Sequence, residues 1–581
     1  MSDQWWRDAI IYGVDVGTFL DSNGDGSGDF AGLTSRLDYL QGLGVNCLWV
    51  LPFFPGPDRD NGYDVSDYYG VDRRFGDPGD FVEFLREAGS RGMRVMVDLV
   101  VEHTSDQHPW FQAARADPNS RYRDYYVWVD EPPENPDYQP IFPGVEESVW
   151  HWDQAAGQYY FHTFYHHQPS LNHANPRVRE EVKRIMGFWL QLGVAAFRVD
   201  AASHMLEPKG SMDFPGDPHA VLREYRQFAA VREGRVAMMG ESDVPPHQVA
   251  DFFGDGDELN LLMNFLLNNY LFLALARESA EPLRHALQLV PPGSGKGQWA
   301  NFLRNLDEVD LERLTGAERE EVYRRFAPRE EMRVYGRGIR RRLAPMLGGD
   351  RKRMEQAFSL LFTLPGAPLL VYGDEIGMGE DLSRPERESV RTVMQWSDDR
   401  NAGFSTAEEG ALVAPVVTRG QFGYRKVNVA DQERNGDSFL RWMQNAIRTR
   451  RECPEFGWGT LTLLESTNPA VLAHRVDWNQ NGIVVVHNLA AAPAEVSLEL
   501  EGNGGEWLED LLRRERLKIP RSGRLSLRME GYGYRWLRLA GMRSRRANPS
   551  AGADRGASRS GSGSRGRSGG GGLSGSGGEA R

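Results

Sequence analysis

Cysteine is scarce in this chain of 581 residues. The sequence holds Cys47 and Cys453 alone, and neither lies in a CxxC motif or beside a cluster of histidines. A disulfide framework and a cysteine-based zinc site are therefore excluded. The core must come from apolar side chains, and a hydrophobic fraction of 40% in a chain of this length predicts an enzyme-sized protein with more than one domain.

Long apolar runs are also missing. The longest, residues 358–372, is interrupted by Pro365, Gly366 and Pro368 and is too short to cross a bilayer. The first residues, Met-Ser-Asp-Gln-Trp-Trp, do not have the charged segment and apolar segment that are typical of a secretory leader. We therefore expect a cytoplasmic protein with no membrane partner.

The net charge of −14 comes from the part of the chain before residue 541. From Gly541 onward, eight arginines outnumber Asp554 and Glu579 in a Gly/Ser-rich stretch. An acidic body argues against nucleic acid as the main partner. The composition predicts that residues 541–581 are a disordered tail. A tether for RNA or membrane is the less favoured alternative, because the arginines are sparse among glycines.

Eight short apolar runs alternate with amphipathic helical patterns. This alternation predicts an α/β fold, a (β/α)₈ TIM barrel. A doubly wound sheet fits less well, because no glycine-rich phosphate loop follows the first run, and no organic cofactor is expected. The predicted strands are residues 10–12, 47–51, 95–101, 195–199, 236–239, 259–263, 299–303 and 369–372.

Two further regions interrupt or follow the barrel pattern. The segment after the third strand is long and rich in aromatic residues, which predicts an inserted subdomain at residues 104–175. Beyond residue 456 the pattern changes to alternating apolar and polar residues, which predicts a C-terminal antiparallel β-domain at residues 457–540. The barrel then comprises residues 1–103 and 176–456.

Three acidic residues each come shortly after a predicted strand: Asp200, Glu241 and Asp307. Barrels of this type keep their chemistry at the carboxyl ends of the strands, so these side chains should converge. Two opposed carboxyl groups are what glycosidic-bond chemistry requires. Taken singly, each could equally be an ion pair or a helix cap.

Five motifs give the chain a family resemblance. In order, they are similar to the spaced motifs of the α-amylase superfamily of retaining glycoside hydrolases and transglycosylases. The motifs are residues 98–103 (Asp-Leu-Val-Val-Glu-His), 197–200 (Phe-Arg-Val-Asp), 240–241 (Gly-Glu), 305–307 (Asn-Leu-Asp) and 372–377 (Tyr-Gly-Asp-Glu-Ile-Gly).

Within that superfamily the chain most resembles the trehalose synthases, which are maltose α-D-glucosyltransferases. The resemblance covers about residues 5–540. It rests on residues 21–30, 61–65, 103–111 and 394–405. The substrates that it implies are maltose, trehalose or short α-glucans, and the oligomeric state, including a homo-oligomer, is left open.

The resemblance implies a retaining double displacement, with Asp200 as nucleophile, Glu241 as acid and base, and Asp307 holding sugar hydroxyls. Arg198, two residues before Asp200 on the same strand face, should keep that carboxylate ionised. Burial after an apolar run should raise the pKa of Glu241 towards the value that a general acid needs.

The resemblance also assigns a glucose-holding subsite. Its residues are Asp60, Tyr63, His103 and Arg400, and Tyr63 would offer its ring to a sugar face.

The loop from Asp21 to Asp29 carries oxygen ligands at alternate positions. They are Asp21, Asn23, Asp25, the Ser27 carbonyl and Asp29. Such a set predicts a structural Ca²⁺ site, which Mg²⁺ could also fill. The alternative is an Asx-rich turn without an ion.

Several residues depart from the family pattern, among them Ser170, Val393 and residues 201–204, and two of the departures stand next to site residues. Glu102 stands where an asparagine is usual, and it could either ligate or disturb a second calcium. Leu306 replaces a histidine that usually binds the glucose. The loss of this polar contact should reduce transition-state stabilisation by about 1 to 3 kcal/mol. Three functions remain: an isomerase with a closed pocket, an α-glucosidase or α-amylase that admits water, and a catalytically weakened sugar-binding paralogue.

Overall fold

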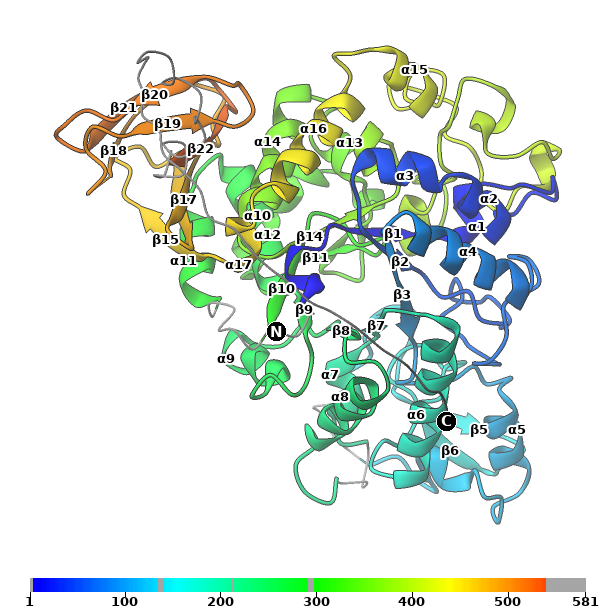
Figure 1. Ribbon diagram of the computed structural model, residues 1–581. Coiled ribbons are helices and arrows are strands. Elements are labelled where there is room, and N and C mark those ends of the chain that lie inside the picture. Colours follow the sequence, from blue (N-terminus) through cyan, green and yellow to red (C-terminus); the bar gives the residue numbers. More distant parts are fainter. Residues whose placement is uncertain (1–3, 134–138, 210–213, 291–296, 501, 540–581) are drawn as a thin grey trace, which may run out of the picture. The chain divides into compact units, whose positions relative to one another are not determined.

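The computed structural model describes residues 4–133, 139–209, 214–290, 297–500 and 502–539 (Figure 1). The chain up to Leu539 forms one compact unit. The predicted disordered tail, residues 541–581, lies outside the described residues.

Eight parallel strands close into a barrel, in the spatial order β1-β14-β10-β9-β8-β7-β3-β2. This confirms the predicted (β/α)₈ fold, and every predicted strand overlaps one of the observed ones. The barrel strands are β1 (Ile11–Val14), β2 (Cys47–Val50), β3 (Arg94–Leu99), β7 (Ala196–Val199), β8 (Ala237–Gly240), β9 (Leu261–Met263), β10 (Gln298–Phe302) and β14 (Ala367–Val371).

Local sequence signals set the helices that surround the barrel. Helix α6 starts after Asn175, whose side chain accepts from the backbone N–H of Arg177, and ends at Gly193, whose φ of 112° suits glycine. Its buried face ends with Trp189, and truncating a buried tryptophan costs about 3 to 5 kcal/mol. The α-helices are α1 (Val16–Phe19), α2 (Phe30–Ser35), α3 (Leu37–Leu43), α4 (Pro78–Ser90), α5 (Pro109–Ala116), α6 (Pro176–Leu192), α7 (Ala202–Leu206), α8 (Ala220–Arg232), α9 (Pro246–Val249), α10 (Phe265–Arg277), α11 (Glu281–Leu289), α12 (Gly316–Phe326), α13 (Leu343–Met346), α14 (Arg351–Thr363), α15 (Val429–Arg434), α16 (Phe439–Arg451) and α17 (Glu455–Trp458).

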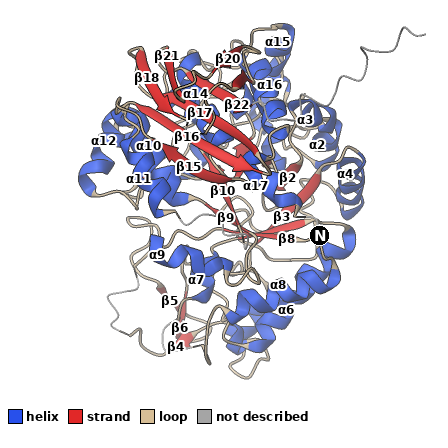
Figure 2. Ribbon diagram, turned by 60° about the vertical axis from the view of Figure 1, so that its left-hand side comes forward, coloured by secondary structure: helices blue, strands red, loops and turns tan. Residues whose placement is uncertain are grey.

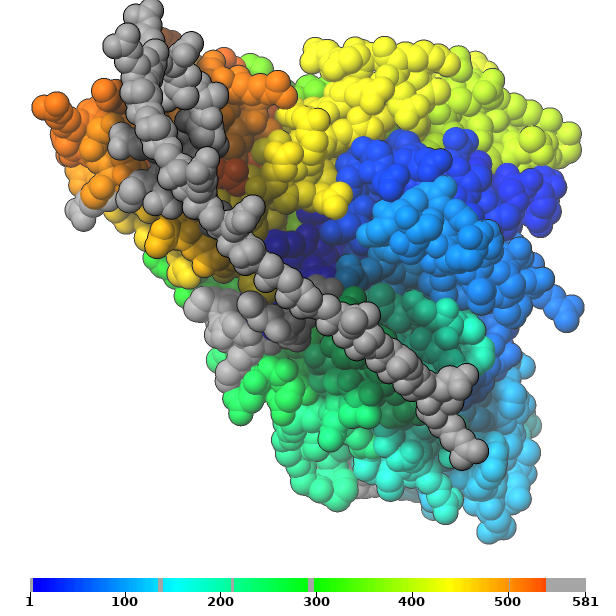
Figure 3. All heavy atoms as spheres, viewed as in Figure 1, coloured from blue at the N-terminus to red at the C-terminus, as the bar shows by residue number. Residues whose placement is uncertain are grey.

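The segment between β3 and α6 contains a small antiparallel sheet of its own, in the order β4-β6-β5. Its strands are β4 (Trp128–Val129), β5 (Trp150–Asp153) and β6 (Gln158–Phe161). In the space-filling view this segment, in cyan, lies at the surface beside the teal and green residues that follow it (Figure 3). We call residues 104–175 the insertion below.

A second excursion, which the sequence did not predict, follows β10. It holds a three-stranded sheet of β11 (Val309–Asp310), β13 (Gly338–Ile339) and β12 (Arg333–Val334). This excursion touches the insertion, because Arg337 Nη1 donates to the Ile141 carbonyl at 2.9 Å. Two segments far apart in sequence therefore meet beyond the carboxyl ends of the strands.

The C-terminal region is antiparallel, as predicted, and its strands are drawn in red in Figure 2. A six-stranded sheet runs β15-β16-β17-β22-β19-β20, and β18 pairs with β21. No helix in the described ranges has the length and apolar character needed to span a membrane. The strands are β15 (Thr460–Leu464), β16 (Val471–Trp478), β17 (Asn481–Asn488), β18 (Ala494–Glu499), β19 (Trp507–Asp510), β20 (Arg516–Lys518), β21 (Arg524–Met529) and β22 (Tyr534–Leu539).

Candidate active site

Six of the predicted site residues line one cavity of about 250 Å³ at the carboxyl ends of the barrel strands. Asp200 follows β7 directly, Glu241 follows β8 directly, and Asp307 lies five residues beyond β10. The other three are Asp60, Tyr63 and His103. The barrel thus brings together side chains that are spread over about 250 positions of the sequence.

Arg198 lies beneath this cavity and joins the two carboxylates. Its Nη1 pairs with Asp200, and its Nη2 lies 2.5 Å from Glu241 Oε2. Asp98 on β3 holds the same guanidinium from behind at 2.6 Å, and Arg198 is 1% exposed. The sequence predicted the contact with Asp200 but not the one with Glu241.

The two carboxyl groups titrate as a pair around Arg198. Burial raises the pKa of Glu241 to about 7; Arg198 opposes this shift, and the charge of Asp200 adds to it. Burial also raises the pKa of Asp200, again against Arg198. A pKa of about 7 suits Glu241 to donate and accept a proton near neutral pH.

Asp307 is held by two arginines that the sequence did not single out. Arg391 Nη2 lies 2.8 Å and Arg387 Nη1 lies 3.1 Å from its Oδ1. Although burial alone would raise it, these two charges lower the pKa of Asp307. Arg387 also reaches Asp60, with Nη2 2.7 Å from Oδ1, so one guanidinium joins two walls of the cavity.

The position of Arg400 corrects the predicted glucose subsite. Arg400 lies in a short 3₁₀ helix, Arg400–Gly403, and its side chain is 56% exposed and pairs with Glu408 at 2.7 Å. It does not line the cavity. The arginine that pairs with Asp60 is Arg387, which the loop after β14 carries inwards.

Aromatic side chains from the insertion and the second excursion cover the cavity. Phe142 stacks on Tyr165 with ring centroids 4.6 Å apart and lies 4.7 Å from the ring of Tyr335. The hydroxyls of Tyr165 and Tyr335 both donate to Glu386 Oε2 at 2.7 Å. We call these four residues the clasp; its three rings are all buried.

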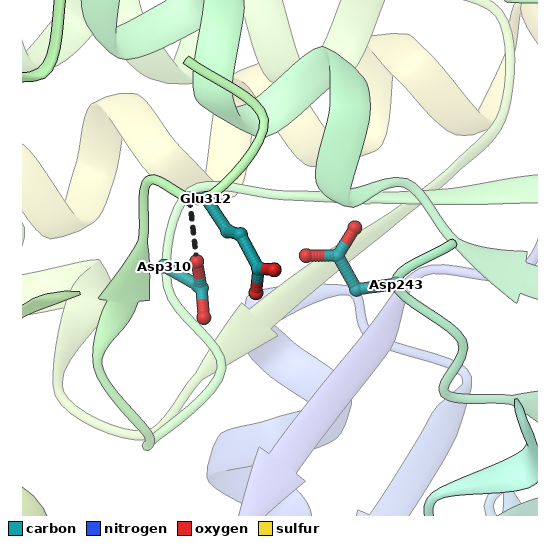
Figure 4. A group of neighbouring side chains, drawn as sticks. All are labelled: Asp243, Asp310 and Glu312. Carbon is teal, nitrogen blue, oxygen red and sulfur yellow. Dashed lines mark hydrogen bonds between the residues drawn. The ribbon is translucent and has the colours of Figure 1, made fainter. Parts of the chain in front are cut away.

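Three further carboxylates line the outer part of the cavity: Asp243, Asp310 and Glu312 (Figure 4). Their oxygens lie within 4.8 Å of one another. Arg313 pairs with Asp243 at 2.9 Å, and Arg337 pairs with Asp310 at 2.7 Å. Two arginines thus offset most of the charge of this cluster, which offers both donors and acceptors to a polar ligand.

The matches with known proteins agree with this geometry. Residues 16–459 match the family described as alpha amylase, catalytic domain, and residues 481–538 match the sucrose hydrolase-like C-terminal domain. The chain belongs to the α-amylase family. A trehalose synthase from Pimelobacter sp. is 41% identical over 524 residues, which cover 88% of this chain and 91% of that protein.

Other members of the α-amylase family are similar over comparable lengths. The trehalose synthase/amylase of Mycolicibacterium smegmatis is 42% identical over 514 residues, covering 86% of each protein. Among solved structures, the trehalulose synthase of Pseudomonas mesoacidophila is 28% identical with a TM-score of 0.73, covering 92% of this chain and 99% of that one. An α-amylase from H. orenii has the same identity and TM-score.

The structure accounts for the two departures from the family pattern that stand next to site residues. Leu306 is 1% exposed and packs in the barrel core rather than against the cavity, while its carbonyl accepts from Arg391 at 3.0 Å. Its φ of 73° turns the chain just before Asp307. The carboxylate of Glu102 forms a buried ion pair with Lys209.

The loop predicted to bind calcium is held by its own hydrogen bonds. Asp21 accepts from the backbone N–H groups of Gly24 at 2.6 Å and Gly26 at 2.8 Å, and Asp29 caps α2. Within the described residues, the loop's aspartates do not belong to a group of three or more acidic, histidine or cysteine side chains whose ligand atoms lie within 4.8 Å of one another. The atoms of this loop that could bind a metal are all oxygens, which is the ligand type that Ca²⁺ prefers.

The residues that sequence reasoning missed share one feature: they act from loops. Arg387 and Arg391 lie four positions apart after β14, and that spacing next to a family motif was the one available signal. Nothing in the sequence marked Lys209 or the clasp, since each depends on where a long loop folds back.

Proposed function

We propose that the protein is a trehalose synthase-like transglycosylase that interconverts maltose and trehalose by a retaining double displacement. One observation carries the proposal: Arg198 joins the carboxylates of Asp200 and Glu241 at the base of a cavity whose wall includes Phe142 of the clasp. The similarity to trehalose synthases over most of the chain supports the choice of sugar.

The first displacement follows from the protonation of the pair. The ionised Asp200 carboxylate attacks the anomeric carbon of the non-reducing glucose, and the glycosidic C–O bond breaks. Glu241, protonated near neutral pH, gives its proton to the leaving oxygen. The products are a glucosyl ester on Asp200 and a free glucose.

The second displacement reverses these roles. The freed glucose turns in the cavity and presents its anomeric hydroxyl, and Glu241 takes the proton of that hydroxyl. The hydroxyl oxygen bonds to the anomeric carbon held on Asp200 as the ester C–O bond breaks, which frees the Asp200 carboxylate. Asp307, held by Arg387 and Arg391, is placed to accept hydrogen bonds from the hydroxyls of the glycone. The carboxylates and arginines around Asp243 supply partners for the moving glucose.

The balance between isomerase and hydrolase depends on water. If water reaches the glucosyl ester first, the same machinery is an α-glucosidase or α-amylase. The clasp favours the isomerase, because it joins the insertion to two other loops over the cavity. Hydrolysis is the alternative outcome and needs no different residues.

We also propose that Asp21, Asn23, Asp25, the Ser27 carbonyl and Asp29 bind Ca²⁺, with Mg²⁺ as a substitute. The oxygen donor set supports this site. The ion would stabilise the loop before α2 and takes no part in the chemistry. No organic cofactor is needed for the two displacements.

Incubation with maltose, and separately with trehalose, tests the proposed reaction when the sugars are resolved by NMR. We expect each disaccharide to give the other with little free glucose, and Asp200→Asn to abolish both conversions. Mainly glucose would make the protein a hydrolase. Tight sugar binding without turnover would support the weakened paralogue instead.

A further inference from the structure

One buried carboxylate, that of Glu102, connects four segments of the chain. Its Oε1 accepts from Thr163 Oγ1 at 2.9 Å and pairs with Lys209 Nζ. Its Oε2 accepts from His103 Nδ1 at 3.2 Å and from Ser170 Oγ at 3.3 Å. Thr163 and Ser170 belong to the insertion, whereas Lys209 belongs to the loop after α7.

The ion pair at this point is internal. Glu102 is 0% and Lys209 4% exposed. Although burial alone would raise it, the charges of Lys209 and His103 lower the pKa of Glu102 to about 2. The carboxylate is therefore ionised at neutral pH, and removing a partner of a buried charge is far more costly than breaking a surface pair.

The hydrogen bonds of His103 fix its protonation. Its Nε2 lies 3.0 Å from the Tyr63 carbonyl, which can only accept, so Nε2 carries a hydrogen. Its Nδ1 faces the ionised carboxylate of Glu102 and carries a hydrogen for the same reason. His103 is therefore an imidazolium in the cavity wall, facing the side on which Asp200 lies.

We propose that Lys209 is a positioning residue for the glucose-binding side of the cavity, acting through Glu102 on His103. Lys209 does not line the cavity. Its ammonium holds one edge of the Glu102 carboxylate, so that the other edge faces Nδ1 and keeps the imidazolium in place. The inference rests on the proposed function, since it concerns the site where a glucose unit would bind.

The other titratable histidines nearby have separate partners. His204 pairs with Glu207 at 3.0 Å, and His173 contacts the Val101 carbonyl and the Tyr225 hydroxyl. Lys209 and His103 are thus the cations that contact Glu102 among the described residues. The ring of Phe161 lies 5.5 Å from Lys209 Nζ and completes the apolar wall on that side.

The test measures binding of deoxynojirimycin, a cationic glucose-shaped iminosugar, by calorimetry, together with the kinetics of maltose conversion. In Lys209→Met we expect the Kd of the iminosugar and the KM for maltose to rise together by about tenfold, with a smaller change in kcat. The matched control is Lys183→Met, which removes a lysine that pairs with Glu180 and Glu224 on the outside of the barrel. That variant should bind as the wild type does.

The double variant Lys209→Met with Glu102→Gln separates positioning from general stability. Replacing both charges should recover much of the Tm lost in Lys209→Met, because a neutral pair is tolerated where an isolated charge is not. Binding should stay weak, since a neutral amide no longer holds His103 as a cation. Full recovery of both Tm and binding, or unchanged binding in Lys209→Met, would overturn the inference. Failure of the wild type to bind the iminosugar would instead defeat the proposed function.

Discussion

At the scale of single residues, the chemistry depends on how one guanidinium is shared. Arg198 contacts Asp200, Glu241 and Asp98, so its charge is divided among three carboxyl groups. Asp307, in contrast, pairs with two arginines: Arg391, and Arg387, which it shares with Asp60. This difference explains why the pKa of Glu241 is raised to about 7 while that of Asp307 is lowered.

The pH dependence of the reaction follows from Glu241. Because its pKa is raised to about 7 and the protonated form must donate, kcat/KM for maltose should fall as the pH rises through about 7. The acid limb should reflect protonation of Asp200 at lower pH. Initial rates measured from about pH 4 to pH 9 check this, and an alkaline limb that is absent below about pH 9 would contradict the assignment.

Arg387 and Arg400 offer a matched comparison. Arg387→Lys breaks a guanidinium that spans Asp60 and Asp307, and lysine cannot span both. The loss of one charged hydrogen bond, about 1.5 to 3 kcal/mol, should lower kcat/KM by about 10- to 100-fold. Arg400→Lys changes an exposed pair with Glu408 and should leave the kinetics unchanged. A larger effect at Arg400 would restore the interpretation drawn from the sequence.

At the scale of elements, the sequence predicted the strands but not the loops. A barrel strand needs only a short apolar run, and the residue after it points to the same end of the barrel as its counterparts, so Asp200 and Glu241 could be located from sequence. Arg387 and Lys209 could not, because their loops are positioned by packing against other loops. The prediction that Arg400 lies in the glucose subsite failed for the same reason.

Loosening the clasp should shift the reaction towards hydrolysis. Tyr335→Phe and Tyr165→Phe each remove a hydroxyl that donates to Glu386, and with it a link between loops over the cavity. We expect the ratio of free glucose to trehalose to rise several-fold while maltose consumption changes little. Tyr323→Phe is the control, because the Tyr323 hydroxyl is buried and has no hydrogen-bond partner among the described residues. An unchanged ratio in both clasp variants would remove the clasp from the account of water exclusion.

The predicted calcium loop can be tested at Asp25. Asp21 and Asp29 stabilise the loop through their own hydrogen bonds, so substituting them would also disturb the fold. Asp25 is exposed, and its side chain accepts one backbone N–H, from Ser27 at 2.9 Å. Calcium at 100 times its Kd should add about 2.7 kcal/mol of stability, so EDTA should lower Tm by several degrees. In Asp25→Asn this response should shrink sharply.

Asp117→Asn is the matched control for the calcium loop. Asp117 is also exposed and accepts one backbone N–H, from Asn119 at 2.8 Å. This variant should keep the full response to EDTA. A wild-type Tm that calcium and EDTA leave unchanged would favour the Asx-rich turn without an ion.

At the scale of the whole molecule, the C-terminal sheet is attached to the barrel through buried histidines. His487 contacts Ser359 of α14 at 2.9 Å, and His474 contacts the Thr363 carbonyl at 3.1 Å. The two rings are parallel, with centroids 6.5 Å apart. The sequence predicted the sheet from its alternation, but these contacts depend on the packing of β16 and β17 against a barrel helix, which no local pattern reveals.

Acid should weaken this attachment. Burial lowers the pKa of His474 to about 4, whereas an unfolded histidine titrates near 6.5. The unfolded state therefore takes up a proton first as the pH falls, so the contribution is complete above about pH 6.5 and declines towards pH 4. At pH 5 the loss is about 2 kcal/mol for this residue alone.

The measurement is the free energy of unfolding by urea at pH 7 and pH 5. In His474→Gln, whose amide keeps a donor for the Thr363 carbonyl, the difference between the two pH values should be about 2 kcal/mol smaller than in the wild type. His474 also lowers the pKa of its neighbour His487, so the comparison reports on the histidine pair, while the other buried histidines contribute equally to both proteins and cancel. His247→Gln alters an exposed histidine and should leave the difference unchanged. If His474→Gln lost as much stability in acid as the wild type, the attachment of the sheet would not depend on a neutral histidine at this position.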